Sequence, residues 1–320
     1  MADLPAIVPA PDPLAPYLAE AETYVRRAKA ENTVKAYRSD WARFARFCQG
    51  REVASLPAAP ATVAAYAAEA ARCLKANTIE RHLTAISQAH QLAGVPNPIE
   101  DKLVRTVMAG IRRVKGTAQH GKEPLSPELL RKMFRGAPDN LRARRDRALL
   151  LVGFAGAFRR SELVALRHED VCFTDEGLVV TIPKSKTDPE GAGQTIGIPY
   201  GSHPESCPVR ALDAWLERSN ITCGYLFTAI GRWGGEVTAK PICDHQFAKI
   251  IKRLAVRAGL SAASFSGHSL RSGLATSAAE GGATERAIME QDPAPLAQTG
   301  SQVHPPGSLF KDNAAARSGL

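Results

Sequence analysis

The 320-residue sequence contains only six cysteines, and no two of them form a Cys-x-x-Cys pair. They are widely spaced along the chain, at Cys48, Cys73, Cys172, Cys207, Cys223 and Cys243. A zinc ribbon needs closely spaced cysteines, and a disulfide framework needs a regular, paired set. The spacing therefore argues against both, and we expect the thiols to be reduced.

Long apolar runs are also missing from the sequence. Charged residues or prolines interrupt each apolar stretch before it is long enough to span a bilayer. Residues 1–16, MADLPAIVPAPDPLAP, lack the basic and apolar regions of a secretory signal, and their prolines predict a flexible, extended arm. We therefore expect a cytoplasmic protein that does not bind membranes.

Basic residues are in excess. Lys and Arg number 41 against 32 Asp and Glu, which gives a formal net charge of +9. Clustered cations gain affinity for a polyanion by releasing its condensed counterions. The charge favours a polyanionic partner over a neutral metabolite, although a merely basic soluble protein is equally consistent with charge alone.

Residues 17–114 have apolar side chains at three- and four-residue steps, which predicts a bundle of helices. We expect one helix to start at an Asn32-Thr33 cap and another at Asn77-Thr78. Two more are expected over residues 60–73 and 102–114. The predicted apolar stripes of the first and third helices are Val34, Tyr37, Trp41, Phe44 and Phe47, then Ile79, Leu83 and Ile86.

Between residues 115 and 124 the periodicity fails, and KGTAQHGKEP predicts an interdomain linker. A second domain, residues 125–320, is expected to begin with a helix capped by Ser126. The β-prone runs around residues 179–182 and 195–198 flank the loop KSKTDPEGAG. They predict an antiparallel hairpin, joined by a short strand near residues 171–173. A later helix is expected to be capped by Asp244, with Phe247, Ile250, Ile251 and Leu254 in its apolar stripe.

Three local motifs in the second domain could carry chemistry. In GAFRRSELVAL, Glu162 follows Arg159 by three residues, so the carboxylate can steady the guanidinium on one helix face. A surface Arg/Glu pair would have the same spacing. Lys184 and Lys186 lie at the tip of the predicted hairpin, where lysines are usually solvated.

The third motif is SGHSLRSG, in which His268 and Arg271 project from one side of a helix that starts near residue 266. A helix start and a guanidinium both favour phosphate, and an imidazole beside them can move a proton near neutral pH. A single His-x-x-Arg is short enough to arise by chance.

Taken together and in this order, the three motifs resemble those of the tyrosine recombinase (phage integrase) family, in particular its Cre-like branch. The segments ENTVKAYRSDWARFARFC and NTIERHLTAISQAHQLAGVPNP are similar to the helical core-binding domain of that family. The resemblance implies a mainly α protein: an N-terminal SAM-like helical bundle and a C-terminal α+β catalytic-type domain with a small antiparallel sheet.

The resemblance also implies roles for the motif residues. Arg159 and Arg271 would grip the scissile phosphate, and Glu162 would orient the first of them. Lys186, which precedes a threonine as the family's hairpin lysine does, would protonate the leaving 5′ oxygen, and His268 would assist proton transfer. Two fixed guanidiniums stabilise the charge that develops in phosphodiester transesterification. This chemistry needs neither a metal nor a nucleotide cofactor, and we find no carboxylate cluster or P-loop that would hold one.

The family's nucleophile, a tyrosine that forms a 3′-phosphotyrosine link, has no counterpart here. The six tyrosines are at positions 17, 24, 37, 66, 200 and 225, so none follows Arg271. The region where it is expected reads DPAPLAQTGSQVHPPG, with four prolines that ordinary helices do not accept. Ser301, His304 and Ser308 lie nearby, but a serine without an adjacent base is a weak nucleophile.

Family-like sequence resumes in SLFKDNAAARSGL. Residues 292–307 therefore suggest a short stretch translated out of frame by two compensating shifts. The alternative is a genuine segment in which the helix has decayed. The coding DNA distinguishes the two hypotheses, because only the first requires another frame that encodes a tyrosine-bearing helix.

The sequence thus predicts a DNA-binding protein that clamps duplex DNA between its domains, with Arg112, Arg113 and Lys115 contacting DNA. By family analogy it would form a tetramer on DNA. We expect site-specific recombination or integration as its ancestry and impaired strand cleavage. The alternatives are a non-catalytic architectural or regulatory relative, or an RNA- or polyanion-binding helical protein whose motifs are coincidental.

Overall fold

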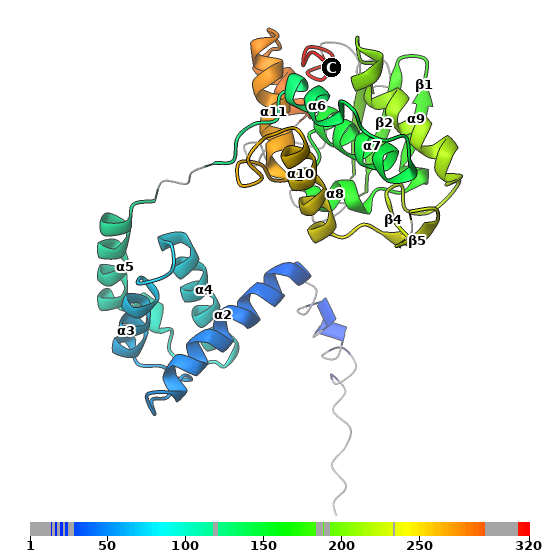
Figure 1. Cartoon of the computed structure of the whole chain (residues 1–320). Helices are drawn as coiled ribbons and strands as arrows, with labels where there is room; N and C mark the ends of the chain where they lie inside the picture. The colour runs from blue at the N-terminus through cyan, green and yellow to red at the C-terminus, as the bar shows by residue number, and fades with distance from the viewer. Residues whose placement is uncertain are drawn as a thin grey trace, which may run out of the picture. The chain divides into compact units, whose positions relative to one another are not determined.

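A computed structural model gives the structure of the protein. It describes residues 14, 17, 20, 21, 23, 24, 29–117, 121–183, 188, 193–232, 234–291 and 313–320. The chain forms two compact units, Met1–His120 and Gly121–Leu320 (Figure 1).

The first unit is a helical bundle. Its helices are α2 (Glu31–Gln49), α3 (Pro60–Ala70), α4 (Ala76–Leu92) and α5 (Lys102–Lys115), with a short 3-10 turn, η1 (Pro98–Glu100), before the last of them. Ile79, Leu83 and Ile86, predicted as one apolar stripe, are all buried. In the first helix the stripe is buried at Phe44 and Phe47 and only partly buried nearer the N-terminus.

The second unit is mixed. Its helices are α6 (Pro127–Phe134), α7 (Leu141–Ala155), α8 (Arg160–Ala165), α9 (Pro208–Ser219), α10 (Asp244–Arg257), α11 (His268–Glu280) and α12 (Glu285–Gln291). Between α8 and α9 the chain forms a 3-10 turn, three strands and a second 3-10 turn. In chain order they are η2 (His168–Asp170), β1 (Val171–Thr174), β2 (Gly177–Ile182), β3 (Gln194–Pro199) and η3 (Pro204–Ser206). A second pair of strands is β4 (Thr228–Ile230) and β5 (Val237–Pro241).

The main sheet is antiparallel with the order β1-β2-β3, and Val180 pairs with Ile196 in the centre of the hairpin. Leu178, Val180 and Ile198 are fully buried, so one face of the sheet packs on the core. The predicted hairpin and its flanking short strand are confirmed. The mainly helical fold class, with a helical first domain and a small antiparallel sheet in the second, is confirmed as well.

Helix α7 is the centre of the second unit. Every residue from 148 to 155 is buried, as expected for a helical segment that is apolar all round. It packs against α6, α8, α9 and α11. Helix α8, which Arg159 caps, and helix α11, which contains Arg271, therefore pack on the same buried helix.

Several predicted helix starts are wrong by a residue or two. Helix α2 begins at Glu31 and α4 at Ala76, and neither has a side-chain cap, so Asn32 and Asn77 lie inside the first turns. Asp244 is the first residue of α10 and not its cap. The predicted Ser126 cap is confirmed, since its hydroxyl accepts a hydrogen bond from the Leu129 N–H at 3.3 Å.

Two further differences concern extent. The helix expected over residues 60–73 ends at Ala70, and the sequence pattern did not predict the strands β4 and β5. The strands are only three and five residues long, too short to show alternation.

Candidate functional site

A tight turn places Arg159 between α7 and α8. Ala157 adopts a left-handed conformation with φ of 48°, which costs energy for a residue with a side chain. A Cβ on Gly156 would lie 2.2 Å from the Phe158 ring, so the turn has room only for glycine there. The buried Phe158 ring and this fixed backbone set where Arg159 begins.

Glu162 holds Arg159 in two ways. Its Oε1 accepts a hydrogen bond from Nη1 of Arg159 at 2.7 Å, and its Oε2 accepts one from the Arg159 backbone N–H at 2.8 Å. The Glu162 side chain is 6% exposed and that of Arg159 is 19% exposed, so the pair is shielded from water. The pairing suggested by the three-residue spacing is present, and it is more than a surface ion pair.

Arg271 lies in the first turns of α11 and is half-buried. Burial lowers the pKa of its guanidinium, the positive charge of Arg159 lowers it further, and Glu162 opposes both effects. The charges of Arg159 and of its partner Glu162 therefore both act on Arg271. The structure thus brings together residues that are more than a hundred positions apart in the sequence.

Packing on α7 explains this convergence. A Cβ on Gly153 would lie 2.6 Å from Cδ2 of Leu163 and 3.3 Å from Cδ1 of Leu270. These leucines directly follow Glu162 and directly precede Arg271. The absence of a side chain at Gly153 lets α8 and α11 meet at one point of α7, which fixes both arginines relative to each other.

His268 is the first residue of α11 and is exposed. The preceding Gly267 approaches both neighbouring helices, since its Cβ would lie 2.9 Å from the Phe247 ring and 3.5 Å from Cβ of Arg160. Helices α8, α10 and α11 therefore meet beside His268. Lys184 and Lys186, the predicted hairpin lysines, lie outside the described residues, as do Ser301, His304 and Ser308.

The arrangement of Arg159, Glu162 and Arg271 carries a net charge of +1. Guanidiniums stay protonated near neutral pH and bind phosphate oxygens through a planar pair of N–H groups. A buried carboxylate that holds one of them removes its rotational freedom before a ligand arrives. This geometry suits one backbone phosphoryl group.

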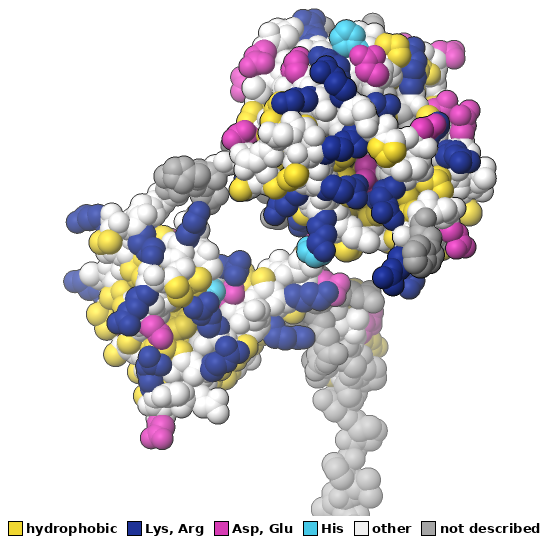
Figure 2. Space-filling model, in the orientation of Figure 1, with side chains coloured by type: hydrophobic (Ala, Val, Ile, Leu, Met, Phe, Trp, Pro, Cys, Tyr) yellow, Lys and Arg dark blue, Asp and Glu magenta, His cyan; other side chains and the backbone are white. Residues whose placement is uncertain are grey.

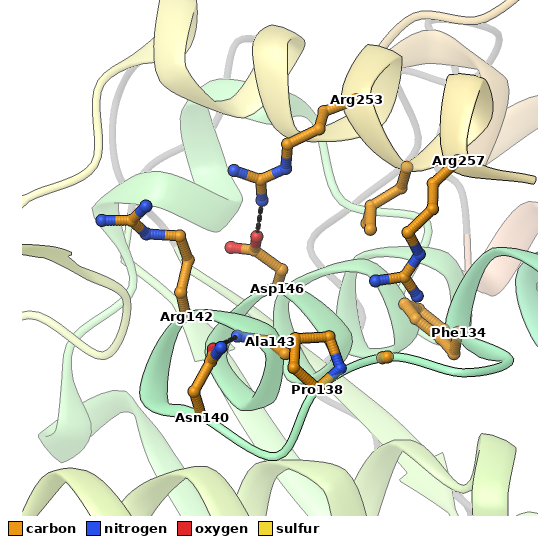
Figure 3. A pocket seen from close by; sticks show the side chains of 10 residues that line it. Phe134, Pro138, Asn140, Arg142, Ala143, Asp146, Arg253 and Arg257 are labelled. Atoms are coloured by element: carbon orange, nitrogen blue, oxygen red, sulfur yellow. Dashed lines mark hydrogen bonds and ion pairs between the residues drawn. The ribbon is translucent and has the colours of Figure 1, made fainter. Parts of the chain in front are cut away.

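A second charged cluster ties the far half of α7 to its neighbours and was missed by sequence reasoning. Asp146 is 1% exposed and accepts a hydrogen bond from Arg145 at 2.7 Å, while Arg253 of α10 pairs with its other oxygen (Figure 3). Arg145 also donates to the Thr228 carbonyl of β4 at 3.0 Å. Only the adjacent Arg-Asp is visible in the sequence, because Arg253 lies 107 positions away.

A pocket of about 150 Å³ lies next to this cluster, with Phe134, Pro138 and Leu254 among its lining residues and Arg142, Arg253 and Arg257 at its sides. Arg257 donates to the Met133 carbonyl at 2.6 Å. Asp146 lies in the first half of α7, whereas Arg159 follows the C-terminal end of that helix as the N-cap of α8, so the pocket is separate from the arginine site.

The residues of the first unit that are predicted to contact DNA lie in the last turn of α5. Arg112, Arg113 and Lys115 are all exposed. Arg112 pairs with Glu80 of α4, and the Lys115 ammonium donates to the Ala71 carbonyl. Figure 2 shows Lys and Arg side chains spread over the visible surface of both units, with fewer acidic ones among them.

Within the part of the chain that the structure describes, no group of three or more His, Cys, Asp or Glu side chains is placed to hold a metal. None of the described helices is long and apolar enough to cross a membrane.

Comparison with known protein families agrees with the geometry. Residues 123–291 match the model of the phage integrase family, and residues 22–94 match that of the phage integrase N-terminal SAM-like domain. The chain belongs to the phage integrase family. The resemblance to tyrosine recombinases drawn from the three motifs is thereby confirmed.

Two relatives illustrate the similarity within this family. An integrase/recombinase XerD homolog from Selenomonas ruminantium is 41% identical over 304 residues, which cover 93% of this chain and 88% of the relative. The recombinase Cre of Escherichia phage P1 is 25% identical over 288 residues, 83% of this chain and 81% of Cre.

Solved structures of integrases share the fold. The integrase of transposon Tn1549 in complex with transposon right end DNA aligns with a TM-score of 0.59 at 14% identity, covering 86% of this chain and 90% of that one. A lambda integrase from a tetramer bound to a Holliday junction aligns with a TM-score of 0.55 at 16% identity, covering 91% and 80%.

Proposed function

We propose that this integrase-family protein binds duplex DNA and holds one backbone phosphate between Arg159 and Arg271. The observation that carries the proposal is the buried Glu162–Arg159 pair, whose two charges both act on the half-buried Arg271. Two fixed cations stabilise the added negative charge of a phosphoryl transition state more than that of the ground state. Site-specific recombination or integration is the activity for which this arrangement is suited.

His268 and Lys186 complete the proposed chemistry. His268 is exposed at the start of α11, on the same helix as Arg271, and assists proton transfer at the phosphate. Lys186 protonates the leaving 5′ oxygen. By analogy with the relatives, Arg112, Arg113 and Lys115 contact the DNA backbone, residues 115–124 link the two domains, and several copies assemble on the DNA.

We further propose that DNA binding is retained while strand cleavage is impaired. The motif residues that bind phosphate are present, but no tyrosine follows Arg271. Without a nucleophile of that kind, no covalent protein–DNA bond forms and the bond energy of the phosphodiester is not conserved. A second identical subunit lacks the residue too.

A nicked suicide substrate tests this proposal. It traps a covalent adduct because the released strand end diffuses away after cleavage. We expect a specific, salt-sensitive complex in a binding assay and no adduct that survives denaturation. A denaturation-resistant adduct would show that another side chain acts as nucleophile and would refute impaired cleavage.

A non-catalytic architectural or regulatory role is the second candidate, and the missing tyrosine is the observation that favours it. In that case Arg159→Ala and Arg271→Ala lower DNA affinity only by the share of one phosphate contact each. Arg142→Ala, which removes an arginine at the separate pocket, is the matched control. Equal binding of duplex DNA, RNA and heparin would refute both candidates.

A further inference from the structure

The first unit buries a carboxylate that is bound to one surface arginine. Asp40 of α2 is 3% exposed, whereas the side chain of Arg81 on α4 is 51% exposed. Oδ2 of Asp40 accepts a hydrogen bond from Nε of Arg81 at 2.7 Å, and Oδ1 accepts one from Nη2 at 3.0 Å. These two parallel bonds fix the plane of the guanidinium.

Two more buried side chains stand behind the carboxylate. Nε2 of His82 lies 3.1 Å from Oδ1 of Asp40, and the hydroxyl of Tyr66 lies 2.6 Å from Nδ1 of His82. Burial lowers the pKa of His82 and raises the pKa of Tyr66 to about 12. Near neutral pH the tyrosine therefore donates to the imidazole, and the neutral imidazole donates to the carboxylate.

Stability alone is a poor explanation for this network. Desolvating a carboxylate is costly, and apolar residues of similar volume often stabilise a core as well or better. What the network does provide is a fixed orientation for Arg81. Tyr66, His82 and Asp40 are all buried and hydrogen-bonded, and Arg81 is the one member of the network that reaches solvent. Among the described residues Arg81 makes no other ion pair, and the two bonds to Asp40 do not use the N–H groups of Nη1 or the second N–H of Nη2.

Other cations lie near the N-terminal end of this arginine's helix. Arg43 of α2 is exposed and donates to Sγ of Cys73 at 3.3 Å, in the turn that leads into α4. Its charge also acts on His82, the neighbour of Arg81. Arg72 and Lys75 in the same turn are exposed. Flexible cations of this kind suffice to attract the phosphate backbone without discrimination among sequences.

We propose that Arg81 is a specificity-determining residue that reads a guanine edge in DNA, and that Asp40, His82 and Tyr66 are its positioning residues. Because duplex DNA is the ligand, this role depends on the proposed function. A guanidinium held in one plane matches the paired O6 and N7 acceptors of guanine in the major groove. The geometry is built before DNA arrives, so discrimination does not require ordering a flexible side chain.

Selection from a pool of random duplexes with the full chain tests the role of Arg81. The wild-type protein should enrich a site with at least one guanine whose replacement weakens binding about 5- to 100-fold. In Arg81→Ala and Arg81→Lys that preference should disappear at one position and persist at the others. Arg46→Ala, which removes an exposed arginine of α2 with no buried carboxylate behind it, is the control and should leave every preference intact.

The positioning residues need a separate readout. Tyr66→Phe and Asp40→Asn should weaken the guanine preference while the first unit remains helical by circular dichroism. In Arg81→Ala, adding Tyr66→Phe should cause no further loss of preference, because the network then has nothing to orient.

Two results would overturn the assignment, and they can be told apart. If Arg81→Ala weakens all sequences equally and lowers the salt dependence, the residue contacts phosphate only. If the wild-type protein shows no preference for duplex DNA at all, the proposed function itself fails, and with it the role of Arg81.

Discussion

Replacing Gly273 by alanine tests how α11, the helix of Arg271, is seated. A Cβ at this position would lie 2.1 Å from the Leu125 carbonyl oxygen, whereas ordinary contacts begin near 3.4 Å. The helix and the segment before α6 would have to separate by about 1 Å, because the clash is with backbone. The hydrogen bond from the Leu125 N–H to the Ser269 carbonyl, 2.9 Å long, would be strained at the same time.

The expected magnitude follows from opposing terms. Overpacking of this kind costs about 1–3 kcal/mol, and the strained hydrogen bond adds about 0.5–1.5 kcal/mol. Alanine regains about 1 kcal/mol of helix propensity relative to glycine. We therefore expect Gly273→Ala to destabilise the second unit by about 1–3 kcal/mol, which corresponds to a drop in Tm of roughly 3–9 °C.

Gly110→Ala is the matched control, since Gly110 lies inside α5 with no atom within 4 Å of its Cβ position. There the same substitution should stabilise the first unit by about 0.5–1 kcal/mol. Calorimetry of the full chain with both variants separates the two effects. A Tm that rises in both variants would refute the close approach of α11 to Leu125.

Three further predictions concern local electrostatics and capping. Burial depresses the pKa of His82 in the folded protein, so below about pH 6.5 the unfolded chain binds more protons than the folded one. The free energy of unfolding should therefore fall as the pH decreases through that range. Urea titrations should show a weaker pH dependence in His82→Gln. Ser126→Ala removes the cap of α6 and should cost about 1 kcal/mol in the same titrations, whereas an unchanged midpoint would show that the cap is dispensable. Glu162→Gln keeps a hydrogen-bond acceptor but removes the negative charge by which Glu162 acts on Arg159 and Arg271. We expect a destabilised second unit that bound inorganic phosphate stabilises more than it does the wild type, and equal shifts would contradict the shared carboxylate.

The apolar periodicity of the sequence was sufficient to predict the helices of the first unit and the hairpin of the second. Ile79, Leu83 and Ile86 are buried because a 3.6-residue repeat places them on one face, and the alternation around Val180 likewise predicted a strand with one face in the core. Exact helix starts were not predictable, since Asn32 suits a cap but also tolerates the first turn. In α2 the N-cap is Ala30, two residues before the predicted cap Asn32.

Charged networks were the least predictable part. The pairing of Arg159 with Glu162 could be read from a three-residue spacing, but Asp40 and Arg81 are 41 positions apart and meet only because α2 packs against α4. The convergence of Arg159 with Arg271 was inferred from a family resemblance. No local pattern encodes it, because it depends on Gly153 and the packing on α7.

The hydrogen bonds on either side of residues 292–312 have a practical consequence for protein engineering. Gln291 and Asn313 both donate a hydrogen bond to one acceptor, the Gly197 carbonyl of β3, at 3.0 and 2.9 Å, and Gln291 also donates to the Ala155 carbonyl at 2.8 Å. Farther on, Leu320 is held through its carbonyl by Ser202. Both boundaries of the intervening peptide are thus anchored to a single backbone oxygen. A tyrosine-bearing helix grafted between them would inherit attachment points already in place.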